Sequence, residues 1–383
     1  MLYYNSQSLN NKDVKSVVDS LNSKNITQGP FVNKFEKKIS NYLKSKYTVV
    51  TNSGTSSLYI AIKSLNLKKN STVIMPAVNF ISSYNMCKIL NLNIYLADVD
   101  PVSGQMQPNH FYECIKKNNL RKIDLLINLH MSGHPNNIKE FYDIKKKFNC
   151  YLIEDACHAF GAAYKINNKY FKVGSCKHSD ICTFSFHAIK SITTGEGGAI
   201  CTNNNKFYSK FLLFRSHGII RSKTSHWKYD VVYSSFNFRL SDINCALGIS
   251  QLKRINLFLK KRSLIAKEYL KSLSNFSDNM LTISIDNKLL SSWHLFKIFI
   301  NFKKLKTNKK NYIEFMKKNK ISTQFHYIPI YKFSIFKNKI KLPGAEKHFE
   351  NSVSLPLFYD MKISEVKKVI YLTKKFLNRN KNY

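Results

Sequence analysis

The sequence predicts an α/β fold with a seven-stranded, doubly wound, mostly parallel sheet and a smaller C-terminal α+β domain. Two patterns carry this prediction. From Tyr47 onward, short β-type runs alternate with helical stretches, which is typical of a parallel sheet with helices on both faces. Beyond about Leu273 this alternation stops. The 383 residues suffice for two domains, which we place at residues 1–255 and 256–383.

Two helices are expected before the sheet. The first covers roughly Lys12–Ser23, and the second covers Phe31–Leu43, where apolar residues recur at helical spacing. Gly29-Pro30 separates the two helices. Thr27 and Gln28, in the turn just before, are candidate substrate-binding residues, and an ordinary helix start explains them equally well.

Seven β-type runs follow, most of them separated by helical stretches. They are Tyr47–Thr51, Thr72–Met75, Asn93–Ala97, Asp124–Asn128, Cys150–Glu154, Ile181–Phe186 and Gly198–Thr202. Ligands of doubly wound sheets bind beyond the carboxyl ends of the strands. The polar residues that follow these runs are therefore candidates for a functional site.

The first candidate segment is Asn52–Ser57, which contains Gly54 and Thr55 and precedes a helix expected at Leu58–Leu65. The free N–H groups and the dipole of a helix N-terminus favour phosphate. N-capping by Ser or Thr is the alternative explanation. The sequence contains neither GxxxxGK[ST] nor GxGxxG, which argues against a nucleoside triphosphate or dinucleotide loop.

Three later strand ends carry further candidates. Phe80, in PAVNF, starts a helix and is suited either to core packing or to stacking on a flat ring. Asp155 ends a buried run, where a carboxylate is costly unless it pairs with a cation, such as a protonated pyridine nitrogen, or caps a turn. His130 and His134 are four residues apart, but the intervening glycine and the following proline argue against a helix, so we expect no metal site.

Lys190 is the central candidate. It lies in CTFSFHAIKSITTGEGGAIC (residues 182–201), in a loop of hydroxyls and glycines between two β-type runs. The glycines allow the backbone to approach a ligand closely. An ammonium group in a desolvated site can lose its proton and become an amine nucleophile. We therefore interpret Lys190 as the Schiff-base lysine of a pyridoxal 5′-phosphate (PLP) enzyme, with a surface lysine in a hairpin loop as the alternative.

After the sheet, a helix is expected at Lys206–Phe214, and a long helix starts at Ser241 or Asp242 and runs toward Leu270 with a possible bend. The C-terminal part is predicted to contain a strand at Ser292–Phe302, a helix at Asn308–Lys318, a strand at Thr323–Tyr327 and a terminal helix at Ile363–Phe376. This mixture predicts the smaller α+β domain.

The composition excludes several classes of protein. The formal charge is +38, but the lysines are scattered through every amphipathic helix, so we expect no nucleic-acid-binding patch. A basic nucleic-acid-binding regulator stays the alternative from another class.

No segment approaches the roughly 20 apolar residues of a membrane span, and the start MLYYNSQSLNNKD lacks a signal-peptide pattern, so a cytoplasmic location is expected. The eight cysteines form no CxxC pair and are expected to be reduced core thiols.

Six segments together resemble the DegT/DnrJ/StrS family of fold-type I, PLP-dependent sugar aminotransferases. They are NSGTSSLYIAI, MPAVNF, EDACHAFGA, SFHAIKSITTGEGGAI, FRSHGI and FNFRLSDINCALGISQL. The resemblance covers nearly the whole chain in the expected order. SFHAIK, RSHGI, NFRLSDINCALG and FHYIPIY are most similar to the 4-aminotransferases of pseudaminic acid biosynthesis. Sugar dehydratases of the same fold carry histidine in place of the lysine, so Lys190 favours amino transfer.

The resemblance implies a role for each residue around the cofactor. Lys190 would form the Schiff base and later move the proton between cofactor and substrate. Asp155 would pair with the pyridinium nitrogen, Phe80 would stack on the ring, and His158 would approach the ring oxygen. The ring is the electron sink of the reaction.

The resemblance also implies how the phosphate is held. Gly54, Thr55 and Ser185 would bind it within one subunit. Asn237 would reach the phosphate of the partner subunit's cofactor, which implies a homodimer with shared active sites.

The reaction implied by the resemblance moves an amino group from L-glutamate to the C4 ketone of a UDP-linked 4-keto-6-deoxy-2-acetamido-hexose. The alternative substrates are D-configured UDP- or GDP-linked 4-keto-6-deoxy sugars of the bacillosamine, legionaminic or perosamine type. Besides Thr27 and Gln28, the candidate substrate-binding residues are His187, His217, Arg239, His326 and Tyr331. For His326 and Tyr331, capping or packing roles are equally compatible with the sequence.

Overall fold

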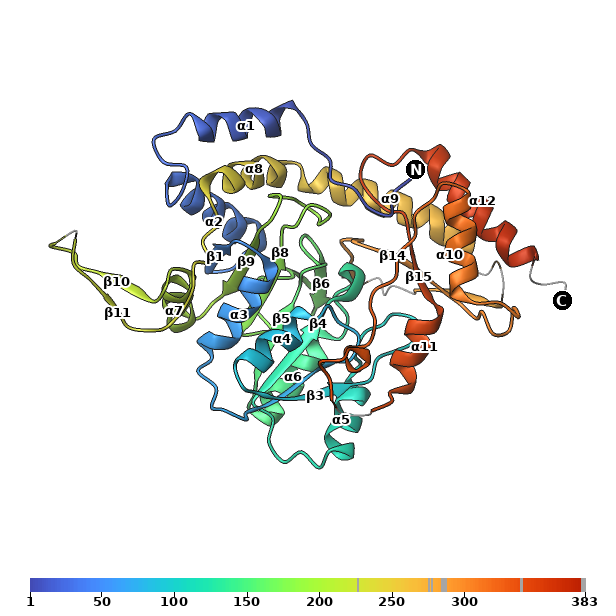
Figure 1. The fold of residues 1–383 in the computed structure, drawn as a ribbon, viewed down its shortest axis with the longest axis horizontal. Coiled ribbons are helices and arrows are strands. Elements are labelled where there is room, and N and C mark those ends of the chain that lie inside the picture. Colours follow the sequence, from blue (N-terminus) through green and yellow to red (C-terminus); the bar gives the residue numbers. More distant parts are fainter. Residues whose placement is uncertain (226, 275, 277, 284–287, 338–339, 380–383) are drawn as a thin grey trace.

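The computed structural model describes residues 1–383 except 226, 275, 277, 284–287, 338–339 and 380–383. A seven-stranded sheet lies at its centre, in the order β1-β9-β8-β5-β4-β2-β3 (Figure 1). The strands are β1 (Tyr47–Thr51), β2 (Thr72–Pro76), β3 (Asn93–Ala97), β4 (Leu125–Leu129), β5 (Tyr151–Asp155), β8 (Ile181–Ser185) and β9 (Gly198–Thr202). All seven predicted strands are confirmed, with ends shifted by at most one residue.

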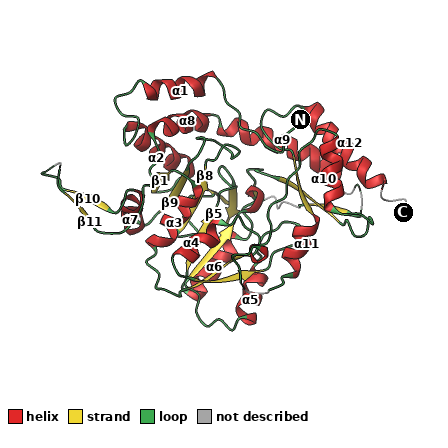
Figure 2. Ribbon diagram, in the orientation of Figure 1, coloured by secondary structure: helices red, strands yellow, loops and turns green. Residues whose placement is uncertain are grey.

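The sheet is mostly parallel, as predicted. Neighbouring strands from β3 through β2, β4 and β5 to β8 are parallel, whereas β9 is antiparallel to both β8 and β1. The strands are buried over most of their length because helices cover both faces of the sheet (Figure 2). These helices are α2 (Pro30–Leu43), α3 (Gly54–Ser64), α4 (Ser82–Ile89), α5 (Pro108–Lys117), α6 (Ile138–Phe148) and α7 (Asn205–Arg215).

The helix α3 begins at Gly54, four residues before the predicted start. Ser53 caps it, because the Ser53 hydroxyl accepts a hydrogen bond from the Ser56 N–H at 3.1 Å. The N-terminus of α3 consequently lies at the carboxyl end of β1, beside the end of β8. The signal for the helix start was the capping serine, since the apolar periodicity begins only later.

The predicted long helix is divided into α8 (Asp242–Lys253) and α9 (Ile255–Leu273), so the bend is at Arg254. The helix α1 (Asn11–Leu21) lies along α8 at the top of Figure 1. The hydroxyl of Ser241 caps α8 by accepting a hydrogen bond from Asn244 N–H.

The C-terminal part has a hydrophobic core of its own, formed by residues between Ile265 and Leu377. A three-stranded antiparallel sheet in the order β12-β14-β15 supports it, with α9, α10 and α12 nearby (Figure 1). The elements are β12 (Met280–Thr282), β14 (Phe296–Ile300), α10 (Lys309–Lys318), α11 (Pro343–Asn351), β15 (Ser352–Leu355) and α12 (Ile363–Arg379). The α+β character is thus present, while the boundary between residues 255 and 256 stays a prediction.

The strand predicted at Thr323–Tyr327 is wrong. Within that segment the backbone makes only an isolated bridge, between Gln324 and Ser354. Ser354 belongs to β15, the outer strand of the three-stranded sheet, and beyond this bridge the segment runs as a loop toward the large sheet, where Ile330 N–H donates to the Ala77 carbonyl.

Short hairpins were not predicted. β6 (Ala163–Ile166) pairs with β7 (Lys169–Lys172) and with β13 (Leu289–Leu290). β10 (Ile219–Arg221) and β11 (Tyr229–Val231) form a second hairpin, which projects from the body of the protein at the left of Figure 1.

None of the helices in the described ranges combines the length and apolar character that crossing a membrane requires.

Candidate active site

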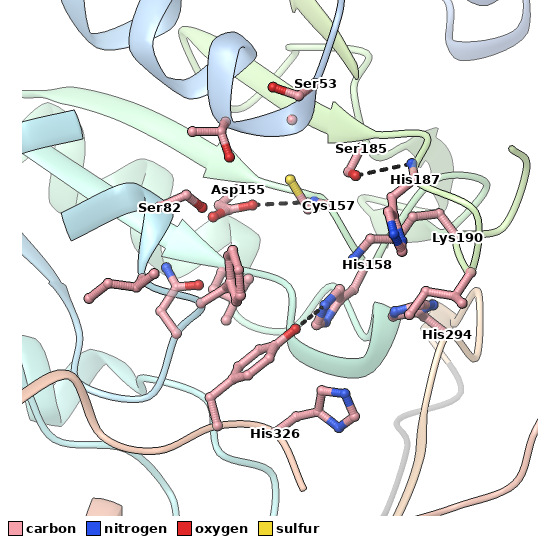
Figure 3. A pocket seen from close by; sticks show the side chains of 18 of the residues that line it. Ser53, Ser82, Asp155, Cys157, His158, Ser185, His187, Lys190, His294 and His326 are labelled. Carbon is pink, nitrogen blue, oxygen red and sulfur yellow. Dashed lines mark hydrogen bonds between the residues drawn. The ribbon is translucent and has the colours of Figure 1, made fainter. Parts of the chain in front are cut away.

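A cavity of about 580 Å³ opens beyond the carboxyl ends of β4, β5 and β8. The large sheet contributes the strand ends and the loops after them, α3 contributes its N-terminus, and the C-terminal part contributes His294 and residues 324–328. The sequence-predicted residues that line this cavity are Gly54, Thr55, Phe80, Asp155, His158, Ser185, His187, Lys190 and His326. These nine residues come from five separate stretches of the chain, and the fold brings them together (Figure 3).

Lys190 lies in the loop between β8 and β9. The loop is tied at its base by hydrogen bonds from Lys190 N–H to the His187 carbonyl and from Thr194 N–H to the Phe186 carbonyl, both at 2.9 Å. Gly195 turns the chain with a φ of +79°, which glycine adopts without strain. Burial lowers the pKa of Lys190, although the nearby Cys157 and Asp155 oppose the shift. A lowered pKa increases the fraction of Lys190 that is unprotonated at neutral pH, and only the unprotonated amine is a nucleophile.

Asp155 ends β5 and its carboxylate is held by two donors. The Ser83 hydroxyl donates to Oδ2 at 2.9 Å, and the Cys157 N–H donates to Oδ1 at 3.3 Å. Figure 3 shows Asp155 and Lys190 on the two sides of Cys157, both at the wall of the cavity. Among the described residues, no cation is bonded to this buried carboxylate, which is therefore suited to stabilise a positive charge on a ligand.

The N-terminus of α3 approaches the end of β8 closely. A Cβ added at Gly54 would lie 2.9 Å from Ser185 Cβ and 3.3 Å from Cys157 Sγ, so glycine is required for this approach. The N–H groups of the first turn, with the hydroxyls of Thr55 and Ser185, therefore face the same end of the cavity. This is a suitable arrangement for a phosphate group.

Among the residues of the C-terminal part that line the cavity and that the sequence analysis missed, Tyr327 and His294 lie beside His158. Tyr327 OH lies 2.8 Å from His158 Nε2, and the ring of His294 lies 4.4 Å from the ring of His158, measured between centroids. The Nδ1 of His294 is buried without a hydrogen-bond partner among the described residues. Tyr327 lies in the FHYIPIY segment, from which the sequence analysis took only His326 and Tyr331, whereas His294 lies in none of the segments that carry the resemblance.

The remaining predicted site residues do not line this cavity. Thr27, Gln28, His217 and Asn237 are exposed, and the Arg239 guanidinium donates to Ser216 Oγ at 2.7 Å. A site assembled from two subunits would have to bring them to the cavity of a partner.

Tyr331 is buried and is not among the residues that line the cavity, and its hydroxyl donates to Glu346 at 2.8 Å, so its contact with substrate stays a prediction. The structure supports packing and hydrogen bonding as the role of this side chain.

The cavity fits PLP. It offers a desolvated amine, a carboxylate across from it, the exposed ring of Phe80 as a stacking surface, and a phosphate cradle at the N-terminus of α3. Within the described ranges, no group of three or more His, Cys, Asp or Glu side chains is arranged to hold a metal ion. A lysine amine and a carboxylate at the carboxyl ends of a mostly parallel sheet define the class of fold-type I, PLP-dependent transferases.

Comparisons with known proteins place the chain within this class. The DegT/DnrJ/EryC1/StrS aminotransferase family matches residues 7–373. The UDP-4-amino-4,6-dideoxy-N-acetyl-beta-L-altrosamine transaminase of Campylobacter jejuni serotype O:2 is 32% identical over 372 residues, which cover 96% of each chain. The structure of Helicobacter pylori PseC, an aminotransferase of pseudaminic acid biosynthesis, matches with a TM-score of 0.90 and 28% identity, over 99% of each chain. The chain belongs to the DegT/DnrJ/EryC1/StrS aminotransferase family, whose cofactor is PLP.

Proposed function

We propose that this protein transfers an amino group from L-glutamate to the C4 ketone of a UDP-linked 4-keto-6-deoxy-2-acetamido-hexose, in the manner of the pseudaminic acid transaminases. The observation that carries this proposal is the meeting of Lys190 and Asp155 in one cavity. The match to the Campylobacter and Helicobacter enzymes over nearly their full lengths supports the choice of sugar.

When bound, PLP supplies an electron-poor ring that accepts the electron pair of the breaking C–H bond. The Lys190 amine is the group placed to take that proton on Nζ and to return it to the substrate carbon, because burial disfavours its charged form. Asp155, fixed by Ser83 and by the Cys157 N–H, stabilises positive charge at the opposite end of the cavity. Phe80 and Tyr327, whose rings are 5.8 Å apart, narrow one side of the cavity.

The choice of sugar is tested by supplying glutamate with either the L-arabino or the D-xylo UDP-4-keto sugar. We expect amination of the L-arabino substrate with a kcat/KM at least about tenfold higher, since a misplaced ring substituent costs about 1.4 kcal/mol or more in the transition state. Product is measured by mass spectrometry of the 4-amino sugar. A preference for the D-xylo sugar would assign the bacillosamine type of substrate, and amination of neither would reject the UDP-sugar proposal.

The active enzyme is proposed to be a homodimer in which Asn237 reaches the cofactor phosphate of the partner subunit. Apolar side chains are exposed on and beside the projecting β10–β11 hairpin, and water contact makes such a surface unfavourable. They are Ile220, Tyr229, Val231, Val232, Tyr233 and Phe236. The Asn237 side chain directly follows this surface and is itself exposed, as a residue that acts across an interface must be.

This shared site is tested by complementation between Lys190→Ala and Asn237→Ala subunits. Each homodimer is expected to be impaired, the second through PLP affinity lowered by about tenfold. In a mixed dimer, the intact Lys190 is on the Asn237→Ala subunit and the intact Asn237 is on the Lys190→Ala subunit. These two residues form one complete site only if Asn237 acts on the partner's cofactor. Co-expressed subunits are therefore expected to regain activity at limiting PLP. If co-expression restores no activity although two different affinity tags, one on each variant, are purified together in one dimer, the shared site is rejected.

A further inference from the structure

Tyr327 and His158 form a hydrogen-bonded pair across the cavity wall. His158 follows β5 in the large sheet, whereas Tyr327 comes from the loop of residues 324–331 in the C-terminal part. The Tyr327 hydroxyl lies 2.8 Å from His158 Nε2, and both residues line the cavity (Figure 3). The resemblance assigns His158 to the cofactor ring oxygen and gives no role to Tyr327, so the pair needs a separate explanation.

The neighbours of His158 determine which of its nitrogen atoms carries the proton. The Ser132 N–H points to Nδ1 at 3.4 Å, so Nδ1 is the acceptor. Burial strongly lowers the pKa of His158, and the nearby Lys190 lowers it further, so the ring is neutral. A neutral imidazole has one N–H, which must then be on Nε2, and Nε2 donates to the Tyr327 oxygen. Because His158 donates to the Tyr327 oxygen, the tyrosine O–H is free to donate its own hydrogen bond to another acceptor.

The loop that carries Tyr327 is fixed at both ends. Gln324 and Ser354 exchange backbone hydrogen bonds at 3.2 and 2.6 Å, and Ile330 N–H donates to the Ala77 carbonyl at 2.9 Å. Between them, His326 Nδ1 lies 2.9 Å from the Ser354 hydroxyl. Because the loop is held on both sides, the position of the Tyr327 hydroxyl follows from the backbone as well as from His158.

Burial, with Asp155 and Cys157 nearby, raises the pKa of Tyr327 well above its usual value, so the hydroxyl keeps its proton and stays a donor. Since His158 Nε2 is itself a donor, this hydroxyl has no acceptor within hydrogen-bond distance in the part of the chain that the structure describes. The titratable or charged groups that face the pair from the surrounding elements are Tyr4, Asp155, Cys157, Lys190, His294, Lys297 and His326.

We propose that Tyr327 is the hydrogen-bond donor that the cavity presents to the ring oxygen of PLP, and that His158 is a positioning residue that holds the Tyr327 hydroxyl from behind. The proposal rests on the proposed function and deepens it. A donor to the ring oxygen withdraws electron density from it, which lowers the pKa of the lysine–cofactor chromophore. The His158–Tyr327 hydrogen bond makes the tyrosine a stronger donor, since linked hydrogen bonds polarise one another.

The test is an absorbance titration of the PLP-loaded protein. Tyr327→Phe removes one oxygen atom and is expected to raise the pKa of the chromophore by about 0.5–1 pH unit. Tyr331→Phe is the matched control, because its hydroxyl lies in the same loop but bonds Glu346 outside the cavity, and its pKa is expected to equal that of the wild type. An unchanged chromophore pKa in Tyr327→Phe would overturn the proposal.

His158→Leu, made in the wild-type and Tyr327→Phe backgrounds, separates the two roles. If His158 acts through Tyr327, its substitution raises the chromophore pKa in the first background and has no further effect in the second. A rise of the same size in both backgrounds would show that His158 contacts the ring oxygen directly, against the proposal. Wild-type protein without a lysine-bound chromophore would instead contradict the proposed role of Lys190, so the two failures are distinguishable.

Discussion

Replacing Lys190 by alanine is expected to lower the turnover of amino transfer by at least about 10³-fold, because the variant lacks both the nucleophile and the proton carrier. The visible absorbance of lysine-bound PLP is also expected to disappear. Folding should be retained, since the amine makes no protein hydrogen bond that the structure describes. Turnover is measured with glutamate and the UDP-4-keto sugar, and folding is measured by thermal unfolding.

Lys172→Ala is the matched control for Lys190→Ala. Lys172 is also partly buried, and burial lowers its pKa, but it lies on β7 outside the cavity, where its amine lies 3.4 Å from Tyr42 OH. We expect wild-type turnover and an intact chromophore in this variant. Wild-type turnover in Lys190→Ala would reject Lys190 as the catalytic lysine, whereas equal losses in the two variants would indicate a general effect of removing a partly buried lysine.

The free energy of unfolding is expected to fall steeply as the pH drops below 6.5. Burial, together with the nearby Lys297, lowers the pKa values of His134 and His326 from 6.5 to about 3. Between these values the unfolded chain binds protons at both side chains and the folded chain does not. Stability present above pH 6.5 is therefore lost on acidification, by about 1.4 kcal/mol per pH unit for each group and about 3 kcal/mol per unit for both.

Urea unfolding at pH 7.5, 6.5, 6.0 and 5.5 measures this loss. His134→Phe keeps an aromatic ring against Trp293, whose ring lies 4.9 Å away, and is expected to reduce the slope by about 1.4 kcal/mol per pH unit. His217→Phe, in which an exposed ring is replaced, is the control and is expected to leave the slope unchanged. Stability that is constant between pH 7.5 and 5.5 would contradict neutral, buried histidines around the cavity.

The central sheet was predictable because its strands are short, apolar and separated by regular helices. The same rules failed for Thr323–Tyr327, where alternating residues suggested a strand. The backbone of that segment pairs only at Gln324, which bridges to Ser354 at the outer edge of β15, and the described structure does not extend this bridge into a ladder. Whether a segment follows a sheet edge or leaves it depends on the tertiary packing and leaves no local mark in the sequence.

The part of the site that lies on the large sheet was also predictable. Gly54, Asp155, Ser185 and Lys190 follow strand ends, and all strand ends of a parallel arrangement meet at one edge of the sheet. His326 was predicted from the same loop, but Tyr327 and His294, more than 100 residues after Lys190, were not, because the sequence does not show which side chains of the C-terminal part face the cavity. Their positions depend on how this part packs against the sheet, which periodicity does not encode.

The central claim is that the Lys190 amine is the attachment point of PLP in a cavity whose opposite wall carries Asp155. The most direct test is borohydride reduction of the PLP-loaded protein, followed by proteolysis and mass spectrometry of the peptides. The account predicts one dominant pyridoxyl adduct, on the peptide that contains Lys190. An adduct on a different lysine, or an unmodified Lys190 peptide in a fully loaded and active enzyme, would contradict it.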